Sequence, residues 1–530
     1  MLTYDYVIVG AGSAGCVLAG RLSEDLSAQV LLLEAGDRDR KQEIHIPIGF
    51  PKLFKTSYDW NFHTGKQTEL AQRELYWPRG RMLGGCSSIN AQMWVRGHRA
   101  DYDGWAELGA EGWSYDDVLP YFRRAERRTG SNHDGVYGTD GPLHIQELRD
   151  PNPTTAAFLA ACDEVGMRRL EEMNVPDNEG YAPCPVTQRR GRRWSAADAY
   201  LRPALKRPNL TVTTGAAVRR VLVDDELRAT GVEYTDPSGR THQVAARREV
   251  ILSAGSIGSP HLLMLSGIGD PEALRAADLT PRHELPGVGR NLQDHLVAVA
   301  VVHCTEPVTL AAADKPSPRE LLRYMLFARG MLTSNVGEAA AFIRTDASLE
   351  HPDVEIIFAP GPYINHGLEP PSGHGLTVAS ILLQPESTGT IVATGPDPST
   401  PPAIDPAYLT APGDRKALVA GLRRAADLLN TNALGRYVGA PMAPWPGSDD
   451  EEVLNRYVGD HAETLYHPVG TCRMGVGEDA VVDPQLRVRG ITGLRVVDAS
   501  VMPRINRGHT HAPTVMIGER AADLIDASHA

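Results

Sequence analysis

The sequence predicts an α/β protein, α+β overall. An open parallel sheet covered by helices is interleaved with a domain built on an antiparallel sheet flanked by helices. Two observations carry this prediction. A strand, a glycine-rich turn and a helix follow one another at the N-terminus, and short β-rich segments separated by Gly- and Pro-rich turns fill the chain beyond residue 295. At 530 residues the chain is also too long for one hydrophobic core.

The N-terminal strand is residues 6–9, Tyr-Val-Ile-Val, and residues 10–15, Gly-Ala-Gly-Ser-Ala-Gly, follow it directly. Gly10 permits a tight turn, Gly12 lets the backbone approach a pyrophosphate closely, and Gly15 lets the next helix press against the strand. The N–H groups and the positive dipole end of that helix then face the phosphates. We interpret the segment as a Rossmann-like dinucleotide-binding turn.

A second apolar strand, residues 30–33, ends in Glu34, nineteen residues after Gly15. An acid at about this distance from the turn hydrogen-bonds the ribose hydroxyls of an adenine dinucleotide. Because an acid disfavours a 2′-phosphate, we expect FAD or NAD rather than NADP. These residues alone leave the choice between FAD and NAD open.

Composition and charge exclude several classes of protein. The net charge of −13 argues against nucleic acid as a partner, because phosphate binding needs a basic footprint. We expect the basic run at residues 189–194 to be a solvated loop or a neighbour of a cofactor phosphate. No stretch reaches the ~18 uninterrupted apolar residues of a membrane span, and residues 1–6 contain no Lys or Arg. We therefore expect no membrane span, no signal peptide and a cytoplasmic location.

The six cysteines lie far apart in the sequence, without a Cys-x-x-Cys pair or histidines at metal-binding spacing. We expect reduced thiols, no disulfide framework and no metal site.

Two longer patterns follow the turn. Residues 80–90 read Gly-Arg-x-Leu-Gly-Gly-x-Ser-x-x-Asn, and residues 255–269 read Gly-Ser-x-x-Ser-Pro-x-Leu-Leu-x-x-Ser-Gly-Ile-Gly. Both resemble signatures of the glucose–methanol–choline (GMC) family of flavin oxidoreductases. The resemblance continues through residues 289–295 to the C-terminus, so it covers essentially the whole chain. It implies FAD as the cofactor.

The turn, the acid and the resemblance together give the expected FAD contacts. They are Gly10, Gly12, Ser13, Ala14, Gly15, Glu34, Arg81, Leu83, Gly84, Gly85, Ser88, Asn90, Ala91, Val218, Ala254, Gly255, Asp498, Ala499, Pro513 and Thr514. The resemblance places Val218 at the adenine. Pro513 is expected to open the last helix, residues 514–525, with its N-terminus toward the flavin pyrimidine. Some choline-oxidising members attach FAD through a histidine just before the signature Asn. This chain has Ile89 there, so we expect non-covalent FAD.

Two histidine-bearing segments, residues 466–472 and 509–514, are the catalytic candidates. Oxidation of an alcohol by hydride transfer to flavin N5 needs a group that takes the hydroxyl proton, and the pKa of histidine suits this task. The residues alone leave a structural role open. A metal pair at His509 and His511 is disfavoured because no third ligand is evident. By the resemblance, His467 matches the base and His511 its partner, while His509 is expected to be a neighbour of the site.

Further expectations concern the second half of the chain. Residues 354–358, 376–383 and 390–393 are predicted strands of the antiparallel sheet, and Asp414 is predicted to cap a helix. Plausible walls of the substrate pocket are Trp60, Phe358, Tyr363 and Trp445, and Glu338 matches the position of an acid that faces ammonium in choline-specific members. The predicted domains are residues 1–152, 192–300 and 466–530 for FAD binding, and residues 153–191 and 301–465 for substrate binding.

The expected function is FAD-dependent oxidation of a small-molecule alcohol, a primary alcohol above all, to the aldehyde, with electrons passed to O2 or another acceptor. The alternative is a non-redox enzyme of the hydroxynitrile-lyase type on the same fold. A third class, a flavin-binding protein without catalysis, is disfavoured by the intact pair His467 and His511. The sequence leaves open which alcohol is used, whether the enzyme is an oxidase or a dehydrogenase, and the oligomeric state.

Overall fold

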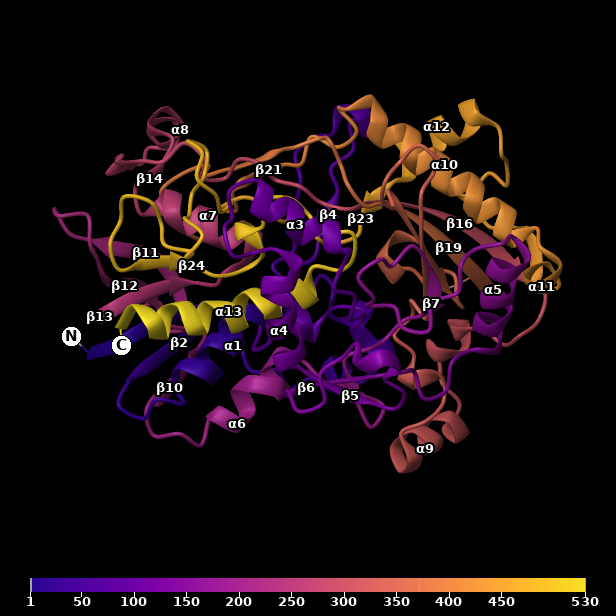
Figure 1. The fold of residues 1–530 in the computed structure, drawn as a ribbon, viewed down its shortest axis with the longest axis horizontal. Helices are drawn as coiled ribbons and strands as arrows, with labels where there is room; N and C mark the ends of the chain where they lie inside the picture. The colour runs from indigo at the N-terminus through magenta and orange to yellow at the C-terminus, as the bar shows by residue number, and fades with distance from the viewer. Residues whose placement is uncertain (1, 371, 530) are drawn as a thin grey trace.

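Two seven-stranded sheets organise the computed structural model, which describes residues 2–370 and 372–529. Each sheet forms the centre of one half of the molecule, and both chain ends lie in the half built on the first sheet (Figure 1). The mixed α/β architecture predicted from the sequence is confirmed.

The first sheet continues the strand that the N-terminus predicts. Its order is β10 (Leu210–Thr214), β2 (Val30–Glu34), β1 (Leu2–Val9), β13 (Thr241–Leu252), β12 (Ala229–Thr235) and β11 (Ala217–Val223), and β24 (Leu494–Val496) also pairs with β13. β10, β2, β1, β13 and β24 are parallel, whereas β11 and β12 are antiparallel. Every residue of β2 is buried, as expected for a parallel strand covered on both faces.

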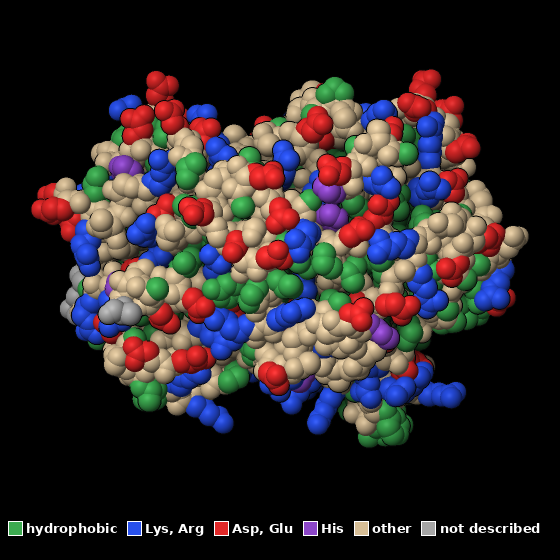
Figure 2. All heavy atoms as spheres, in the orientation of Figure 1, with side chains coloured by type: hydrophobic (Ala, Val, Ile, Leu, Met, Phe, Trp, Pro, Cys, Tyr) green, Lys and Arg blue, Asp and Glu red, His purple; other side chains and the backbone are tan. Residues whose placement is uncertain are grey.

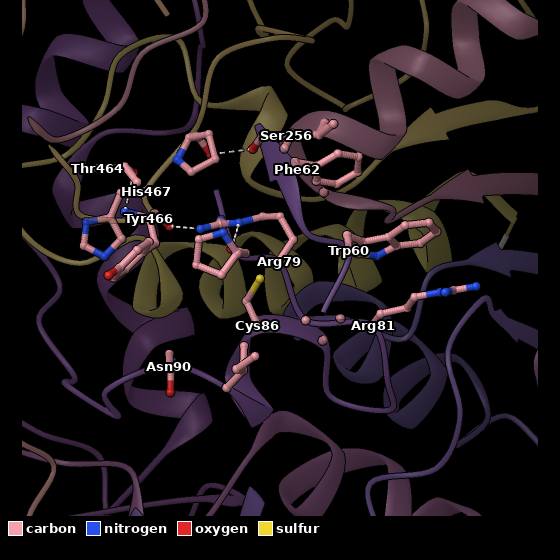
Figure 3. A pocket seen from close by; sticks show the side chains of 18 of the residues that line it. Trp60, Phe62, Arg79, Arg81, Cys86, Asn90, Ser256, Thr464, Tyr466 and His467 are labelled. Atoms are coloured by element: carbon pink, nitrogen blue, oxygen red, sulfur yellow. Dashed lines mark hydrogen bonds between the residues drawn. The ribbon is translucent and has the colours of Figure 1, made fainter. Parts of the chain in front are cut away.

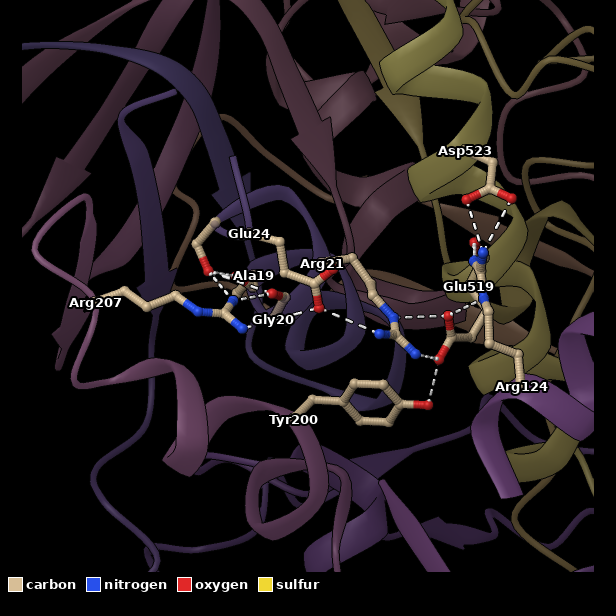
Figure 4. Close-up of polar contacts among 10 residues, drawn as sticks. Ala19, Gly20, Arg21, Glu24, Arg124, Tyr200, Arg207, Glu519 and Asp523 are labelled. Carbon is tan, nitrogen blue, oxygen red and sulfur yellow. Dashed lines mark hydrogen bonds and ion pairs between the residues drawn. The ribbon is translucent and has the colours of Figure 1, made fainter. Parts of the chain in front are cut away.

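Two helices of this half pack closely and share a buried carboxylate. α1 (Ser13–Leu22) lies against α13 (His511–His529). Glu519 of α13 is fully buried and accepts hydrogen bonds from Arg21 of α1, from Arg124 of α4 (Tyr115–Ala125) and from the Tyr200 hydroxyl, at 2.6–2.9 Å (Figure 4). These contacts fix α13 relative to the glycine-rich turn that precedes α1.

The second sheet is antiparallel, as predicted. Its order is β22 (Val438–Pro441), β16 (Leu296–Cys304), β19 (Gly375–Leu382), β18 (Val354–Ala359), β17 (Ala339–Ile343) and β7 (Gly180–Pro183), and β23 (Glu463–Thr464) also pairs with β16. α10 (Pro412–Leu429) and α5 (Pro153–Glu164) cover one face, and α12 (Glu451–His461) packs against α10. The opposite face turns toward the first half, and Ile357 and Ala379 on it line a cavity.

Shorter elements complete the two halves. The remaining helices are α2 (Gln42–His45), α3 (Arg99–Glu107), α6 (Arg202–Ala204), α7 (Gly255–Leu265), α8 (Pro271–Ala276), α9 (Pro318–Phe327) and α11 (Asn432–Gly435). The remaining strands are β3 (Phe62–His63), β4 (Tyr76–Trp77), β5 (Glu126–Thr129), β6 (Leu143–Gln146), β8 (Gln188–Arg189), β9 (Arg192–Arg193), β14 (Ile268–Gly269), β15 (His283–Glu284), β20 (Thr390–Val392) and β21 (Ala403–Asp405). Among the helices of residues 2–370 and 372–529, none is long and apolar enough to cross a membrane.

Several expectations about single elements were wrong. Asp414 does not cap α10: Ala411 stands at the N-cap, and the Asp414 carboxylate accepts from the Glu386 and Ser387 amides at 2.8 and 3.0 Å. β20 pairs with β21 in a separate two-stranded sheet. α13 begins two residues before Pro513, because proline is tolerated in the first turn of a helix.

One predicted domain boundary also conflicts with the strands. Residue 300 lies inside β16, which pairs with β19, β22 and β23 of the second sheet. The change from the first sheet to the second therefore occurs before Leu296. The other predicted domain bounds stay a proposal.

Candidate active site

A cavity of about 990 Å³ lies between the two sheets. Val9 of β1 and Leu33 and Glu34 of β2 line it, so it opens at the carboxyl ends of the parallel strands, where ligands bind in open α/β sheets. The second sheet contributes side chains of β16, β18 and β19 to the opposite wall. Figure 3 shows residues from both halves of the chain, among them Arg81 and His467, around this space.

One wall of the cavity is formed by the backbone of glycine residues. Gly10 has φ +100°, and a Cβ there would lie 2.5 Å from the carbonyl oxygen of Ser253. A Cβ on Gly85 would lie 2.8 Å from the Cα of Gly12, so the turn at residues 84–85 packs directly against the turn at residues 10–15. The Gly84 amide donates to the Ala11 carbonyl at 2.8 Å and holds them together.

Three helices begin at the cavity. Ser13 of α1, Gly255 of α7 and His511 of α13 are the first residues of their helices, and all three line the cavity. Backbone N–H groups in the first turn of a helix have no partner within the helix, and the dipole there favours negative charge. At α7 the Asp498 carboxylate already accepts from the Gly255 amide, so it is the starts of α1 and α13 that are suited to an anionic ligand such as a pyrophosphate.

Glu34 lines the same cavity as the histidines. Its two carboxylate oxygens accept from the amides of Ala11 and Gly36, each at 2.8 Å, and burial raises the pKa of Glu34 to about 6. Val218 of β11 and the Pro-rich loop at residues 397–402 also line it. Sequence reasoning did not place this loop, which comes from the second half of the chain, at the cavity.

His467 is held by a chain of hydrogen bonds that sets its tautomer. Nε2 of His295 lies 3.1 Å from the Leu383 carbonyl oxygen, which can only accept, so Nε2 of His295 carries the proton and Nδ1 is an acceptor. Nδ1 of His295 lies 2.9 Å from Nδ1 of His467. His467 therefore donates from Nδ1, and its Nε2 keeps a lone pair. Burial lowers the pKa of His295 to about 3 and that of His467 well below its ordinary value, so both rings are neutral.

The backbone around His467 is fixed as well. The His467 amide donates to Asp294 Oδ1 at 2.7 Å, and Arg79 donates to the Tyr466 carbonyl at 2.6 Å (Figure 3). Tyr466 has φ +68°, a left-handed conformation that is uncommon for a non-glycine residue. Asp294 and His295 were part of the family resemblance, but the sequence assigned no role to either.

The histidine beside His467 is His509, whereas the sequence analysis expected His511. The ring centroids of His467 and His509 are 5.0 Å apart, and Nε2 of His509 lies 3.0 Å from Glu355 Oε1 of β18. His511 instead lies with Nδ1 3.0 Å from Ser13 Oγ of α1. Burial lowers the pKa of His511 to about 4, and its buried Nε2 has no partner among the described residues.

Most of the predicted contact residues line the cavity. They are Gly10, Gly12, Ser13, Ala14, Glu34, Arg81, Gly85, Asn90, Ala91, Val218, Ala254, Gly255, Asp498, Ala499 and Thr514, together with His467, His509 and His511. Gly15, Leu83, Gly84, Ser88 and Pro513 are not among the lining residues. A Cβ on Gly15 would collide with the Gly10 carbonyl, and Ser88 Oγ donates to the Leu83 carbonyl at 2.8 Å. These residues shape the turns behind the wall.

Two acids that the sequence assigned to ligands, Asp498 and Glu338, accept hydrogen bonds from other groups of the protein. Asp498 accepts from Gly255 N at 2.9 Å and from Ser259 Oγ at 2.5 Å, so its carboxylate holds the start of α7. Glu338 is buried and accepts from Asn152 N, Thr155 Oγ1 and Ser334 Oγ at 2.6–2.7 Å. Glu338 does not line the cavity, so it cannot act as the acid that faces a substrate ammonium.

The predicted pocket walls are half correct. Trp60 and Tyr363 line the cavity. Phe358 points to the other face of β18 and stacks on Phe158 of α5, with ring centroids 4.8 Å apart. Trp445 packs in the same core, 5.3 Å from the ring of Tyr457. Because side chains alternate along a strand, Ile357 takes the cavity position that Phe358 was expected to occupy.

The structure also shows where the basic run and the cysteines lie. Arg193 is buried, donating from Nη1 to Asn90 Oδ1 at 2.7 Å and to the Ser87 carbonyl at 3.1 Å behind the cavity wall, while Arg189, Arg190 and Arg192 are exposed. All six cysteines are free thiols, and the described residues contain no cluster of three metal-ligating side chains.

Comparison with known proteins gives extensive matches. Two family models, both described as GMC oxidoreductase, match residues 4–297 and 385–518. An uncharacterised GMC-type oxidoreductase of Mycobacterium tuberculosis is 51% identical over 528 residues, covering 98% of this chain and 99% of that protein. An alcohol dehydrogenase [acceptor] of Pseudomonas putida is 40% identical over 531 residues, covering 98% and 95%. The crystal structure of pyridoxine 4-oxidase from Mesorbium loti superposes with a TM-score of 0.90 at 33% identity, covering 99% of both chains.

Proposed function

The chain belongs to the GMC oxidoreductase family, and on that premise we propose that it oxidises an alcohol, a primary alcohol above all, to the aldehyde with non-covalently bound FAD. Electrons then pass to O2 or to another acceptor. One observation carries the proposal: His467, whose Nε2 carries no proton, lines the same cavity as the glycine-rich turn and Glu34.

The residues present fit FAD. The glycine-rich turn and the start of α1 offer free backbone N–H groups for the pyrophosphate, and Glu34 is available to the ribose. The buried Nε2 of His511 and Nε of Arg81, without partners among the described residues, are donors or acceptors that a ligand would satisfy. Ile89 also lines the cavity, and its side chain offers no atom for covalent attachment.

His467 and His509 would carry the proton chemistry, each held by a partner. Bound FAD would supply the acceptor for the hydride. Nε2 of His467 takes the hydroxyl proton of the alcohol, while its Nδ1–H stays bonded to His295. Nε2–H of His509 donates to Glu355, which leaves the lone pair of Nδ1 as a second acceptor beside His467. In this proposal His511 does not contact the alcohol. It hydrogen-bonds Ser13 at the start of α1 and helps to hold the cofactor.

An anaerobic panel of alcohols, followed through the flavin absorbance, tests the proposed reaction. A primary alcohol should bleach the flavin and yield aldehyde, and admitting air then distinguishes an oxidase from a dehydrogenase. Acid precipitation should release the flavin into the supernatant. Cleavage of a cyanohydrin without any bleaching by alcohols would establish the lyase alternative instead.

Substitution of the histidines tests the assigned base. His467→Ala should keep FAD and slow flavin reduction by about 10²–10⁴-fold, the usual worth of general-base assistance. Because His509 and not His511 lies beside His467, His509→Ala should slow reduction more than His511→Ala. Stopped-flow reduction at saturating alcohol measures both effects. A His467→Ala rate near that of the wild type would refute the assignment.

A further inference from the structure

α9 presents an unusual concentration of exposed apolar side chains. Leu321, Leu322, Met325, Leu326 and Phe327 have exposed fractions between 43% and 78%, and no residue of this helix is buried. Soluble proteins expose such side chains singly, whereas a contiguous group marks an interaction site. Figure 1 shows α9 projecting from the edge of the half that contains the second sheet, and no residue of α9 lines the cavity.

The apolar side chains form one face of the helix. At about 100° per residue, Leu321, Met325, Leu322 and Leu326 fall within an arc of about 140°. The contacts that attach the helix region to the protein are polar. The Gly330 amide donates to Asp150 at 2.7 Å, and Arg149 donates to the Ala328 carbonyl at 3.2 Å. The apolar face therefore points outward, the reverse of a helix that covers a core.

Basic side chains outnumber acidic ones around this face, although the net charge of the protein is −13: Glu320 of α9 pairs with Arg323, and Asp314 is exposed. Lys315 and Arg319 are exposed and form no ion pair with the described residues, and the same holds for Arg190 and Arg192 on the β8–β9 hairpin. That hairpin lies against the end of α9, because a Cβ on Gly191 would lie 2.5 Å from the Ala328 carbonyl. Figure 2 shows hydrophobic side chains at this projecting corner with Lys and Arg side chains near them.

We propose that α9 and the β8–β9 hairpin form a docking surface for an anionic lipid bilayer. A helix with large apolar side chains on one face and basic groups beside it lies in the plane of a membrane interface, with its apolar face among the lipid headgroups and upper acyl chains. The local positive charge complements anionic headgroups, whereas the rest of the protein is acidic and is repelled by them. The short helix alone offers far less area than the ~800 Å² per partner of a typical stable protein dimer, so a second copy of the chain is not the proposed occupant.

Flotation of the full-length, FAD-loaded protein with vesicles tests the proposal. The wild type should float with phosphatidylcholine vesicles that contain phosphatidylglycerol, and about tenfold less with phosphatidylcholine alone or at high salt. Met325→Glu/Leu326→Glu should abolish flotation, and Arg190→Glu/Arg192→Glu should weaken it. Leu26→Glu/Val476→Glu is the matched control, because these apolar residues are equally exposed but lie elsewhere, and it should bind like the wild type.

Three results would overturn the proposal. One is a wild-type protein that floats with neither vesicle, and another is flotation that survives Met325→Glu/Leu326→Glu. The third is a concentration-dependent dimer in sedimentation velocity that this double variant disperses, which would make the face an interface between copies. Turnover of a water-soluble alcohol with a water-soluble acceptor should be unchanged in all variants, since none of these residues lines the cavity.

Discussion

Replacing His295 by leucine removes the acceptor for Nδ1–H of His467. In the wild type, the Leu383 carbonyl fixes the proton on Nε2 of His295, and this in turn fixes the proton of His467 on Nδ1. Without that acceptor, the tautomer of His467 with its proton on Nε2 becomes competitive. That tautomer cannot accept the hydroxyl proton of the alcohol, so His295 is expected to act as a positioning residue.

The geometry sets the magnitude. The lost contact is one buried hydrogen bond of 2.9 Å, and a buried N–H without a partner costs about 1–3 kcal/mol. At about 1.36 kcal/mol per tenfold change, the ratio of the competent tautomer to the other one falls about 5- to 150-fold. Flavin reduction at saturating alcohol should slow by up to that factor, and by less where the ring prefers the competent tautomer without this hydrogen bond.

Anaerobic stopped-flow reduction is the assay, with FAD content and Tm as measures of integrity. His295→Asn is the control, because an amide can accept from His467 with its oxygen and donate to the Leu383 carbonyl with its nitrogen. It should recover most of the rate. The reasoning is refuted if His295→Leu, fully loaded with FAD, reduces its flavin as fast as the wild type.

Three further outcomes follow from buried groups. Glu34→Ala should lower both FAD retention after gel filtration and the Tm of the apoprotein, because Glu34 also holds two backbone amides; equal Tm values would contradict that role. Glu519→Gln should lower the unfolding free energy, measured by urea unfolding, by about 3 kcal/mol. Asp523→Asn is the control, because Asp523 forms a more exposed ion pair with the same Arg124, and it should cost less than about 1 kcal/mol. The folded pKa of His295, about 3, lies below its unfolded value of about 6.5, so the unfolded state binds the extra proton and stability falls as the pH drops from 7 to 5. His295→Asn should lose about 2 kcal/mol less than the wild type over that interval in urea unfolding.

The features that the sequence predicted correctly depend on residues close together in the chain. Gly10 follows an apolar strand in a left-handed conformation, and Glu34 ends the next strand. The sequence predicts both positions because backbone conformation and strand direction depend on neighbouring residues. The long family patterns likewise located His467 and the glycine-rich turns. Asp414 shows the limit of this reasoning, because an acid in a first turn can cap its own helix or, as here, bind amides of another segment.

Which side chains meet in the site depended on contacts between distant segments. His509 and His511 are two residues apart, and the sequence offers the same ring at both positions. Glu355, 154 residues away, binds one, and Ser13, 498 residues away, binds the other, and these partners decide which ring lies beside His467. The sequence by itself determined the type of protein, its glycine-rich turn and the identity of the candidate base. The tertiary structure decided the partner and the tautomer of that base, because hydrogen bonds between segments become defined only when the two sheets enclose the cavity.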